Sequence, residues 1–323
     1  METENILSNK LSLTEGKAAY DAACKRLLAN KSILAWIMKD CVEEFKDCTI
    51  SDIEDKYIEG DPVISQVAVN PDESVSNIRG IGTEDVSITE GTVTYDIRFI
   101  ATAPSDGGKI ELIINIEAQN RYNPGYPLVK RGIYYGSRMI SAQYGTEFEA
   151  SHYEKIKKVY SIWICTEPPE DKQNSITKYT FKEEYLVGTA KEKKEYYDLI
   201  NVIMIYLGND RSSKRVLKLL EVLLSNTAKA DEKKQILQQD FEIKMTNTIE
   251  REVSDMCNLS DGVEARGLAR GIEQGMAQGM AQSILNAMSG FNVSMEQAMM
   301  ALKIPQEEYE KYKELVNKIK LKN

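Results

Sequence analysis

The sequence predicts a mixed α/β layer fold followed by a region built only of helices. Strand patterns alternate with helical patterns up to about residue 188, two strands are joined by a tight turn, and no strand pattern follows. With 323 residues the chain is long enough for one large domain or two ordinary ones. We expect an α/β domain over residues 1–188, a helical extension over 189–258 and a tail over 259–323.

The composition is typical of a soluble globular protein, with 42% hydrophobic and 28% charged residues. No apolar run approaches the roughly 20 residues that cross a bilayer, so we expect no membrane segment. Five scattered cysteines predict reduced thiols and a cytoplasmic location. The single histidine, His152, argues against a His-rich metal site. The net charge of −9 argues against a large surface for non-specific nucleic-acid binding, although residues 126–160 form a local basic window.

The N-terminal part predicts helices and then a short strand. Apolar residues recur every three or four positions over residues 14–46. Within this span we expect Asn30 to end one helix and Ser32 to cap the next. Residues 62–69 have the pattern of a short strand that ends at Asn70-Pro71.

The central part predicts a sheet with a helix beside it. Residues 91–100 alternate between apolar and polar, residues 110–117 are mostly apolar, and Ser105-Asp-Gly-Gly between them is a turn, which together predict an antiparallel hairpin. An aromatic and basic helix is expected over residues 126–144. The apolar run at residues 159–165 predicts a central strand covered on both faces, and residues 176–181 an edge strand.

The C-terminal part predicts helices only. Residues 196–206 and 213–226 have amphipathic helical patterns, and residues 229–256 predict a long charged helix. Glycine then recurs at positions 267, 271, 275 and 279. A glycine at every fourth position is compatible with either close helix packing or a flexible linker. The linker is favoured because each glycine weakens a helix by roughly 1 kcal/mol. Two short helices are expected over residues 294–320, separated at Pro305.

Two carboxylates mark the hairpin as a candidate site. Asp96 and Glu117 each lie about ten residues from the turn centre, so they are expected roughly opposite each other. Adjacent carboxylates repel unless a positive charge lies between them, and Mg²⁺ commonly takes such oxygen ligands. Gln119 follows Glu117 on the same strand face. A cross-strand ion pair between Arg98 and Glu117, with Asp96 facing solvent, is the alternative structural interpretation.

The spacing D-(20 residues)-E-x-Q resembles the core of the PD-(D/E)XK nucleases, with Gln where Lys is usual. The segments LVKRGIYYGSRMISAQYG and HYEKIKKVYSIWIC are similar to Rpn-type recombination-promoting nucleases, also described as PD-(D/E)XK nuclease family transposases. The N-terminal segment YDAACKRLLANKSILAWIMKDCVEEF, the segment MCNLSDGVEARG and the glycine-stepped tail extend the resemblance over about residues 20–282.

The resemblance implies a restriction-endonuclease-like core of order αβββαβ and a Mg²⁺-dependent endonuclease acting on DNA, with Mn²⁺ as a substitute ion. Asp96 and Glu117 would be catalytic metal ligands, the Ala118 carbonyl would be a further ligand, and Gln119 matches the polar residue after the acid. The reaction would be hydrolysis by a water molecule that the cation activates. The family links this activity to recombination or mobile elements.

Further residues follow from the same resemblance. Asp21 and Lys25 match a D-x-x-x-K pattern in the family's first helix. An acid from this region would complete the site, with Asp21 the choice and Glu43 the reserve. Because an amide cannot supply positive charge, Lys130 or Arg131 would meet the charge of the substrate.

Cutting both strands of a duplex needs two sites, which raises a homodimer as an expectation. The alternative function is a catalytically inactive protein that uses the same fold to bind nucleic acid or another protein. The acidic net charge and Gln119 favour this alternative, and the Asp96/Glu117 pair favours the nuclease.

Overall fold

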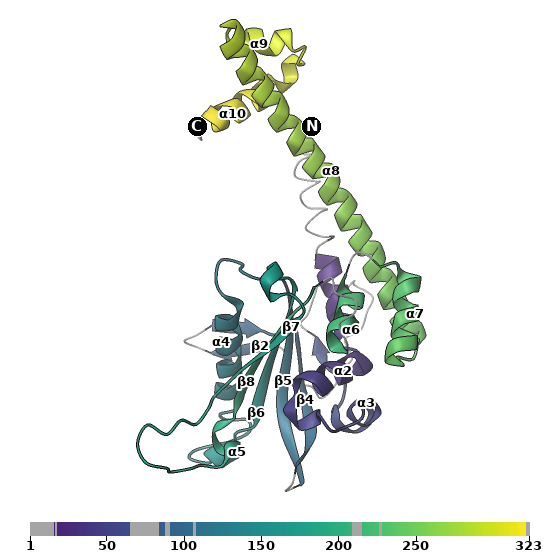
Figure 1. The fold of residues 1–323 in the computed structure, drawn as a ribbon, viewed down its shortest axis with the longest axis vertical. Helices are drawn as coiled ribbons and strands as arrows, with labels where there is room; N and C mark the ends of the chain where they lie inside the picture. Colours follow the sequence, from purple (N-terminus) through teal and green to yellow (C-terminus); the bar gives the residue numbers. More distant parts are fainter. Residues whose placement is uncertain are drawn as a thin grey trace. The chain divides into compact units, whose positions relative to one another are not determined.

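The structure of the chain, a computed structural model, describes Gly16 and residues 18–64, 84–87, 91–105, 108–208, 215–225 and 228–320. It divides into two compact units, one over Lys17–Leu259 and one that combines Met1–Gly16 with Ser260–Asn323. The first unit is built around a six-stranded sheet of order β1-β4-β5-β6-β8-β7 (Figure 1). Its strands are β1 (Val63–Ile64), β4 (Ile97–Ser105), β5 (Gly108–Arg121), β6 (Lys158–Glu167), β7 (Ser175–Thr180) and β8 (Ile200–Tyr206).

Strand direction in this sheet is mixed. β5, β6 and β8 run parallel, whereas β1, β4 and β7 pair antiparallel with their neighbours. The connection from β5 to its parallel neighbour β6 contains α4 (Leu128–Ser141), which is the βαβ arrangement that parallel strands require. A separate two-stranded sheet pairs β2 (Glu84–Ser87) with β3 (Gly91–Thr94). The predicted mixed α/β fold is therefore confirmed.

Helices cover both faces of the sheet. α4 packs on one face, against a cluster that includes Ile113, Trp163 and Met204. The opposite face carries a larger cluster, to which the helical residues 18–28 and 249–256 and three further helices contribute. These are α2 (Lys31–Cys41), α6 (Val216–Leu224) and α7 (Ala230–Phe241). β6 is buried on both faces, which explains why its sequence is a nearly continuous apolar run.

The predicted hairpin is confirmed, but its first strand is interrupted. β4 pairs with β5 so that Ile97 lies opposite Ile116. The strand predicted over residues 91–100 is wrong in one respect, because it breaks at Tyr95 and Asp96 between β3 and β4. Tyr95 packs in the α4 cluster, whereas Ile97 packs on the opposite face of the sheet. The regular alternation in the sequence conceals this change of face.

The helix predicted over residues 196–206 is wrong. Its first part contributes to the short α5 (Lys194–Tyr197), and the rest forms β8 between β6 and β7. The strand pattern therefore returns after residue 188, and β8 belongs to the same sheet as β6. β7 is the edge strand, as predicted. The domain boundaries given above stay a prediction.

Three other predicted boundaries are revised. Asn30 is the N-cap of α2, and its side chain accepts a hydrogen bond from the Ser32 main chain at 3.1 Å, so Ser32 is not the cap. The long charged helix predicted over residues 229–256 is interrupted after α7, where Glu242 adopts a left-handed conformation and α8 (Asn247–Phe291) then begins. The strand predicted over residues 62–69 is described only as β1, and its remainder lies outside the described residues.

The second unit is helical in its described part. The C-terminal part of α8 packs with α9 (Met295–Ala301) and α10 (Tyr309–Lys320) around Ile284, Met299 and Val316. The two short helices predicted over residues 294–320 are thus confirmed. The glycine-stepped segment is helical and lies within α8, and its role as a linker stays a prediction. A Cβ built on Gly271, Gly275 or Gly279 would meet nothing within 4 Å, so among the described residues these glycines serve no close packing.

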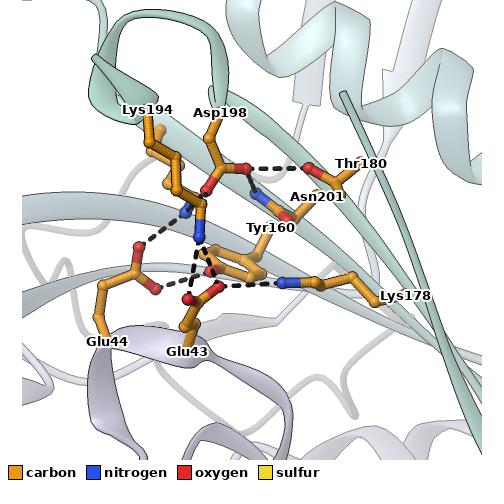
Figure 2. A network of polar contacts seen from close by, with 9 residues as sticks. Glu43, Glu44, Tyr160, Lys178, Thr180, Lys194, Asp198 and Asn201 are labelled. Atoms are coloured by element: carbon orange, nitrogen blue, oxygen red, sulfur yellow. Dashed lines mark hydrogen bonds and ion pairs between the residues drawn. The ribbon is translucent and has the colours of Figure 1, made fainter. Parts of the chain in front are cut away.

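A network of charged side chains ties the segment after α2 to the start of β6 and β8. In η1 (Glu43–Phe45), Glu44 accepts hydrogen bonds from Lys158 at 2.8 Å and from the Tyr160 hydroxyl at 2.6 Å. Asp198 accepts a hydrogen bond from Lys158 at 2.7 Å. It also accepts one from Asn201 at 2.9 Å (Figure 2).

The same network extends to the sheet edge. Lys178 of β7 and Lys194 of α5 both bond to Glu43. Three lysines thus balance three carboxylates, which makes this network a structural anchor between the helical layer and the sheet. No helix within the described ranges is both long and apolar enough to cross a membrane.

We predict that Gly132→Ala destabilises the first unit. A Cβ at Gly132 would lie 2.7 Å from Val202 Cγ1 and 3.0 Å from Trp163 Nε1, so α4 would have to move away from the sheet. Overpacking of this kind costs about 1–3 kcal/mol. Urea unfolding followed by circular dichroism measures the change. Ser137→Ala, on the exposed side of α4, is the control, and equal stability of the two variants would contradict the close packing.

Candidate functional site

The two predicted carboxylates lie together where β4 begins beside β5. The pairing of Ile97 with Ile116 leaves Asp96 and Glu117 next to each other at the open end of the hairpin. The Asp96 N–H donates to Glu117 Oε1 at 2.9 Å, and the Ala118 N–H donates to Asp96 Oδ2 at 3.3 Å. Each acid therefore accepts a main-chain hydrogen bond from the other strand. These reciprocal bonds replace the regular strand ladder and fix both carboxylates.

Glu117 is buried on the α4 face of the sheet. Its side chain lies on the same strand face as Asn115, whose Nδ2 donates to Glu117 Oε1 at 3.2 Å, and its register partner on β6 is Trp163. Only 1% of the residue is exposed. Burial, followed by the nearby negative charge of Asp96, raises the pKa of Glu117 to about 8. Without a cation, this carboxyl group therefore keeps its proton at neutral pH.

Lys25 brings a positive charge to the pair from the other layer of the fold. It belongs to the helical residues 18–28, whose apolar side chains pack on the face opposite to α4. Lys25 Nζ lies 2.9 Å from Asp96 Oδ1 and 2.7 Å from Asp21 Oδ2. Burial raises the pKa of Asp96 despite the opposing attraction of Lys25. Burial also disfavours the charged lysine, but the bonds to Asp21 and Asp96 raise the pKa of Lys25, so it stays protonated.

Arg131 approaches the site from α4. Its guanidinium donates to the Tyr135 hydroxyl at 2.7 Å and to the Tyr126 hydroxyl at 3.2 Å. It also lies over the rings of Tyr135 and Trp163, 5.0 and 5.3 Å from their centres. The charge of Arg131 favours the ionised form of Glu117. Aromatic residues therefore hold a cation within electrostatic reach of the buried acid.

The structure brings most of the predicted residues together in one cluster and leaves four outside it. Asp21, Lys25, Asp96, Glu117 and Ala118 form one connected cluster. The residues outside this cluster are Arg131, which approaches it from α4, and Gln119, Lys130 and Glu43.

Gln119 is partly buried opposite Cys165 and makes no side-chain hydrogen bond to any described residue. Lys130 is exposed on α4. Glu43, the reserve acid, bonds instead to Lys178 and Lys194 in the anchoring network (Figure 2), so its assignment to the site is wrong.

Sequence reasoning missed Asn115 and the aromatic partners of Arg131. Asn115 is fully buried, and no described residue bonds to its Oδ1. A lone amide two residues before Glu117 in an apolar strand was a signal for it. Arg98, the alternative partner of Glu117, lies opposite Asn115 in the register, with its guanidinium 4.9 Å from the centre of the Tyr95 ring.

The donor atoms suit a hard divalent cation. The cluster offers carboxylate oxygens of Asp96 and Glu117 beside the main chain of Ala118, and Mg²⁺ and Mn²⁺ favour such oxygen ligands. The raised pKa of both acids reflects buried negative charge, which a cation would relieve. Within the described part of the chain, no group of three or more His, Cys, Asp or Glu side chains is arranged to hold a metal ion. Main-chain oxygen, water and substrate would have to complete the shell.

The basic window of residues 126–160 is less positive than the sequence suggests. Lys157 pairs with Glu111 and Glu147, and Lys158 pairs with Glu44 and Asp198. Ion pairs therefore neutralise part of the window. Arg131, on α4, remains within electrostatic reach of Glu117.

We predict that Glu117 makes stability fall with rising pH when no metal is present. Folded Glu117 keeps its proton up to about pH 8, whereas an unfolded glutamic acid loses it near pH 4.3. Between these values the folded state binds more protons, so rising pH destabilises it. The side chain of Glu117→Gln cannot ionise, so this variant should have a higher Tm than the wild type at pH 8.5. The Tm should rise by about 2–4 °C for each kcal/mol of ionisation penalty that the substitution removes.

Thermal unfolding in EDTA from pH 4 to 8.5 measures this difference, which should vanish at pH 4. Glu167→Gln, at an exposed position near the end of β6, is the control and should follow the wild type throughout. Identical curves for wild type and Glu117→Gln would contradict the burial of this acid.

Comparison with known proteins identifies the family. The sequence model described as PD-(D/E)XK nuclease family transposase matches residues 99–266, just over half of the chain. The match includes Glu117, Gln119 and α4, and it begins three residues after Asp96. Neither the curated proteins nor the solved structures that were compared give a significant match. The extent of the family match and the sheet that carries the acids together show that this chain belongs to the PD-(D/E)XK nuclease family transposases.

Proposed function

We propose that this chain is a divalent-cation-dependent endonuclease that hydrolyses phosphodiester bonds of DNA where β4 begins beside β5. The observation that carries the proposal is the reciprocal hydrogen bonding of Asp96 and Glu117, which holds a partly buried and a fully buried carboxylate together at the end of adjacent strands. Nucleases of this superfamily generally use divalent metal ions, and the family implies DNA as the substrate. The recombination or mobile-element context is part of the same proposal.

Asp96, Glu117 and the Ala118 carbonyl would hold the cation, with Mg²⁺ the proposed ion and Mn²⁺ its substitute. When bound, such a cation lowers the pKa of water and neutralises charge on the leaving oxygen. The Ala118 N–H keeps Asp96 oriented, and Asn115 keeps Glu117 oriented. Burial against Trp163 limits access of bulk water to Glu117, which strengthens its interaction with positive charge.

The start of α4 would bind the substrate. Because α4 connects the parallel strands β5 and β6, it begins near the end of the sheet where β5 ends. Lys130 and Arg131 lie in its first turn, where the helix dipole also favours an anion. Exposed Tyr134 could stack on a base beside these cations. Cutting of both strands would need two sites, so we propose a homodimer as the active form.

A non-catalytic binding protein of the same fold is the second candidate. The ion pair of Lys25 with Asp96 favours it, since the pair satisfies one acid without a metal. Gln119 favours it as well, because an amide lacks the charge of the motif lysine. Cleavage assays separate the two candidates.

We predict that Asp96→Asn lowers DNA cleavage at least about a hundredfold, which corresponds to about 2.7 kcal/mol of lost transition-state stabilisation. The amide keeps the shape of the side chain but removes the charge that would hold the cation. Nicking of supercoiled plasmid with Mg²⁺ or Mn²⁺ measures the rate. Glu167→Gln is the matched control on an exposed acid and should cut like the wild type. Equal cleavage by Asp96→Asn would refute the site, and no cleavage by any variant would favour the binding protein.

We predict that Arg131→Gln weakens DNA binding in EDTA and reduces its salt dependence. If Arg131 contacts one phosphate, the slope of log Kd against log salt concentration should fall by about one. Fluorescence anisotropy with a labelled duplex measures both quantities. Lys109→Gln, which removes a charge at the other end of β5, is the control. A slope unchanged by Arg131→Gln would exclude a phosphate contact by this residue.

A further inference from the structure

The candidate site lacks the lysine that the PD-(D/E)XK motif names. In this chain the position two residues after Glu117 holds Gln119. Hydrolysis of a phosphodiester increases negative charge on the phosphoryl oxygens, and a fixed cation beside them stabilises the transition state. A neutral amide can donate a hydrogen bond but cannot supply this charge. The charge must therefore come from another element of the fold.

Two cationic side chains lie close to the acids, and they differ in how they are held. The guanidinium of Arg131 is directed to the hydroxyls of Tyr126 and Tyr135 and lies over aromatic rings. The ammonium group of Lys25 contacts Asp96 directly. An ammonium group has three N–H donors. Asp21 and Asp96 take two of them, and among the described residues no third partner contacts Lys25 Nζ, so one donor is left for a substrate.

The Asp96 carboxylate lies between Lys25 and the end of β5 where Gln119 occupies the motif position. Asp96 Oδ1 contacts Lys25 Nζ at 2.9 Å, and Asp96 Oδ2 accepts the Ala118 N–H at 3.3 Å. Ala118 is the direct neighbour of Gln119 in the chain. The lysine from the first helix thus reaches the same end of β5 as the residue it would replace. Only 12% of the Lys25 side chain is exposed, so solvent screens its charge weakly.

We propose that Lys25 supplies the positive charge that the motif lysine supplies in PD-(D/E)XK sites, and that Asp21 is the positioning residue that directs it toward Asp96. The assignment rests on the proposed nuclease function. It explains why the chain can carry Gln119 and keep both acids. It also gives the ion pair of Lys25 with Asp96 a role in the reaction in addition to its role in structure.

Exchanging the two side chains tests the assignment. Lys25→Gln removes the charge but keeps a hydrogen-bond donor, and we expect plasmid cleavage to fall at least about a hundredfold. The double variant Lys25→Gln/Gln119→Lys returns the lysine to its motif position, and we expect it to recover cleavage to within about tenfold of the wild type. Gln119→Lys alone should cut at least as fast as the wild type. Lys109→Gln is the matched control for loss of a lysine and should cut normally.

Binding and stability measurements separate charge from folding. Calorimetric titration with Mn²⁺ should show equal or tighter binding for Lys25→Gln, since the lysine no longer competes for Asp96. Thermal unfolding of each variant shows whether the fold is kept. If Lys25→Gln does not fold, Lys25→Arg carries the test, because it keeps a cation beside Asp96 and should therefore retain cleavage.

The possible results distinguish the role assigned to Lys25 from the nuclease function on which that role rests. If Lys25→Gln cuts DNA as fast as the wild type, the proposed role of Lys25 is overturned and the nuclease function remains. A folded double variant that stays as slow as Lys25→Gln also overturns it. A wild-type chain that cuts no DNA with Mg²⁺ or Mn²⁺ overturns the nuclease itself, and the assignment with it.

Discussion

The hydrogen bond from the Asp96 main chain to the Glu117 carboxylate is the constraint on which the candidate site depends. It forms because the strand breaks at Tyr95, which releases the Asp96 N–H from the regular ladder. The same break turns the Asp96 carboxylate toward the Ala118 N–H and toward Lys25. A single local interruption therefore joins two acids from neighbouring strands to a cation from the opposite layer. The sheet continues regularly from Ile97 onward, so the break removes regular strand pairing only at residues 95 and 96.

The sequence was sufficient to predict the hairpin, its approximate register and the strand β6. The turn at residues 105–108 is short, so counting outward from it places Asp96 near Glu117. The apolar run of β6 is bounded by charged residues, which limits its length to that of a strand. Local pattern and turn chemistry decide these features, and the sequence contains both. The D-x-x-x-K pattern likewise predicted that Asp21 and Lys25 belong to the site, and in the structure Lys25 contacts both Asp21 and Asp96.

The features that were missed depend on contacts between distant segments. β8 reads INVIMIY, a run buried on both faces, and such a run has no period that separates a strand from a helix. The change of face at Tyr95 is set by its packing against Tyr135 of α4, and the alternation in the sequence gives no sign of it. Glu43 was the reserve acid because its residue type was suitable. Lys178 and Lys194, far along the chain, decide its place in the structure (Figure 2).

The bonds made by Glu117 have a consequence for how this family diverges. Its Oε1 accepts from both Asp96 and Asn115, so the residue closes the hairpin as well as serving any chemistry. A descendant that abandoned cleavage would still be selected to retain Glu117 for its architecture. The Gln119 side chain makes no such bond within the described residues, so we expect this position to be substituted first. Among relatives, the identity of the residues at positions 25 and 119 should therefore track activity better than the presence of the acid.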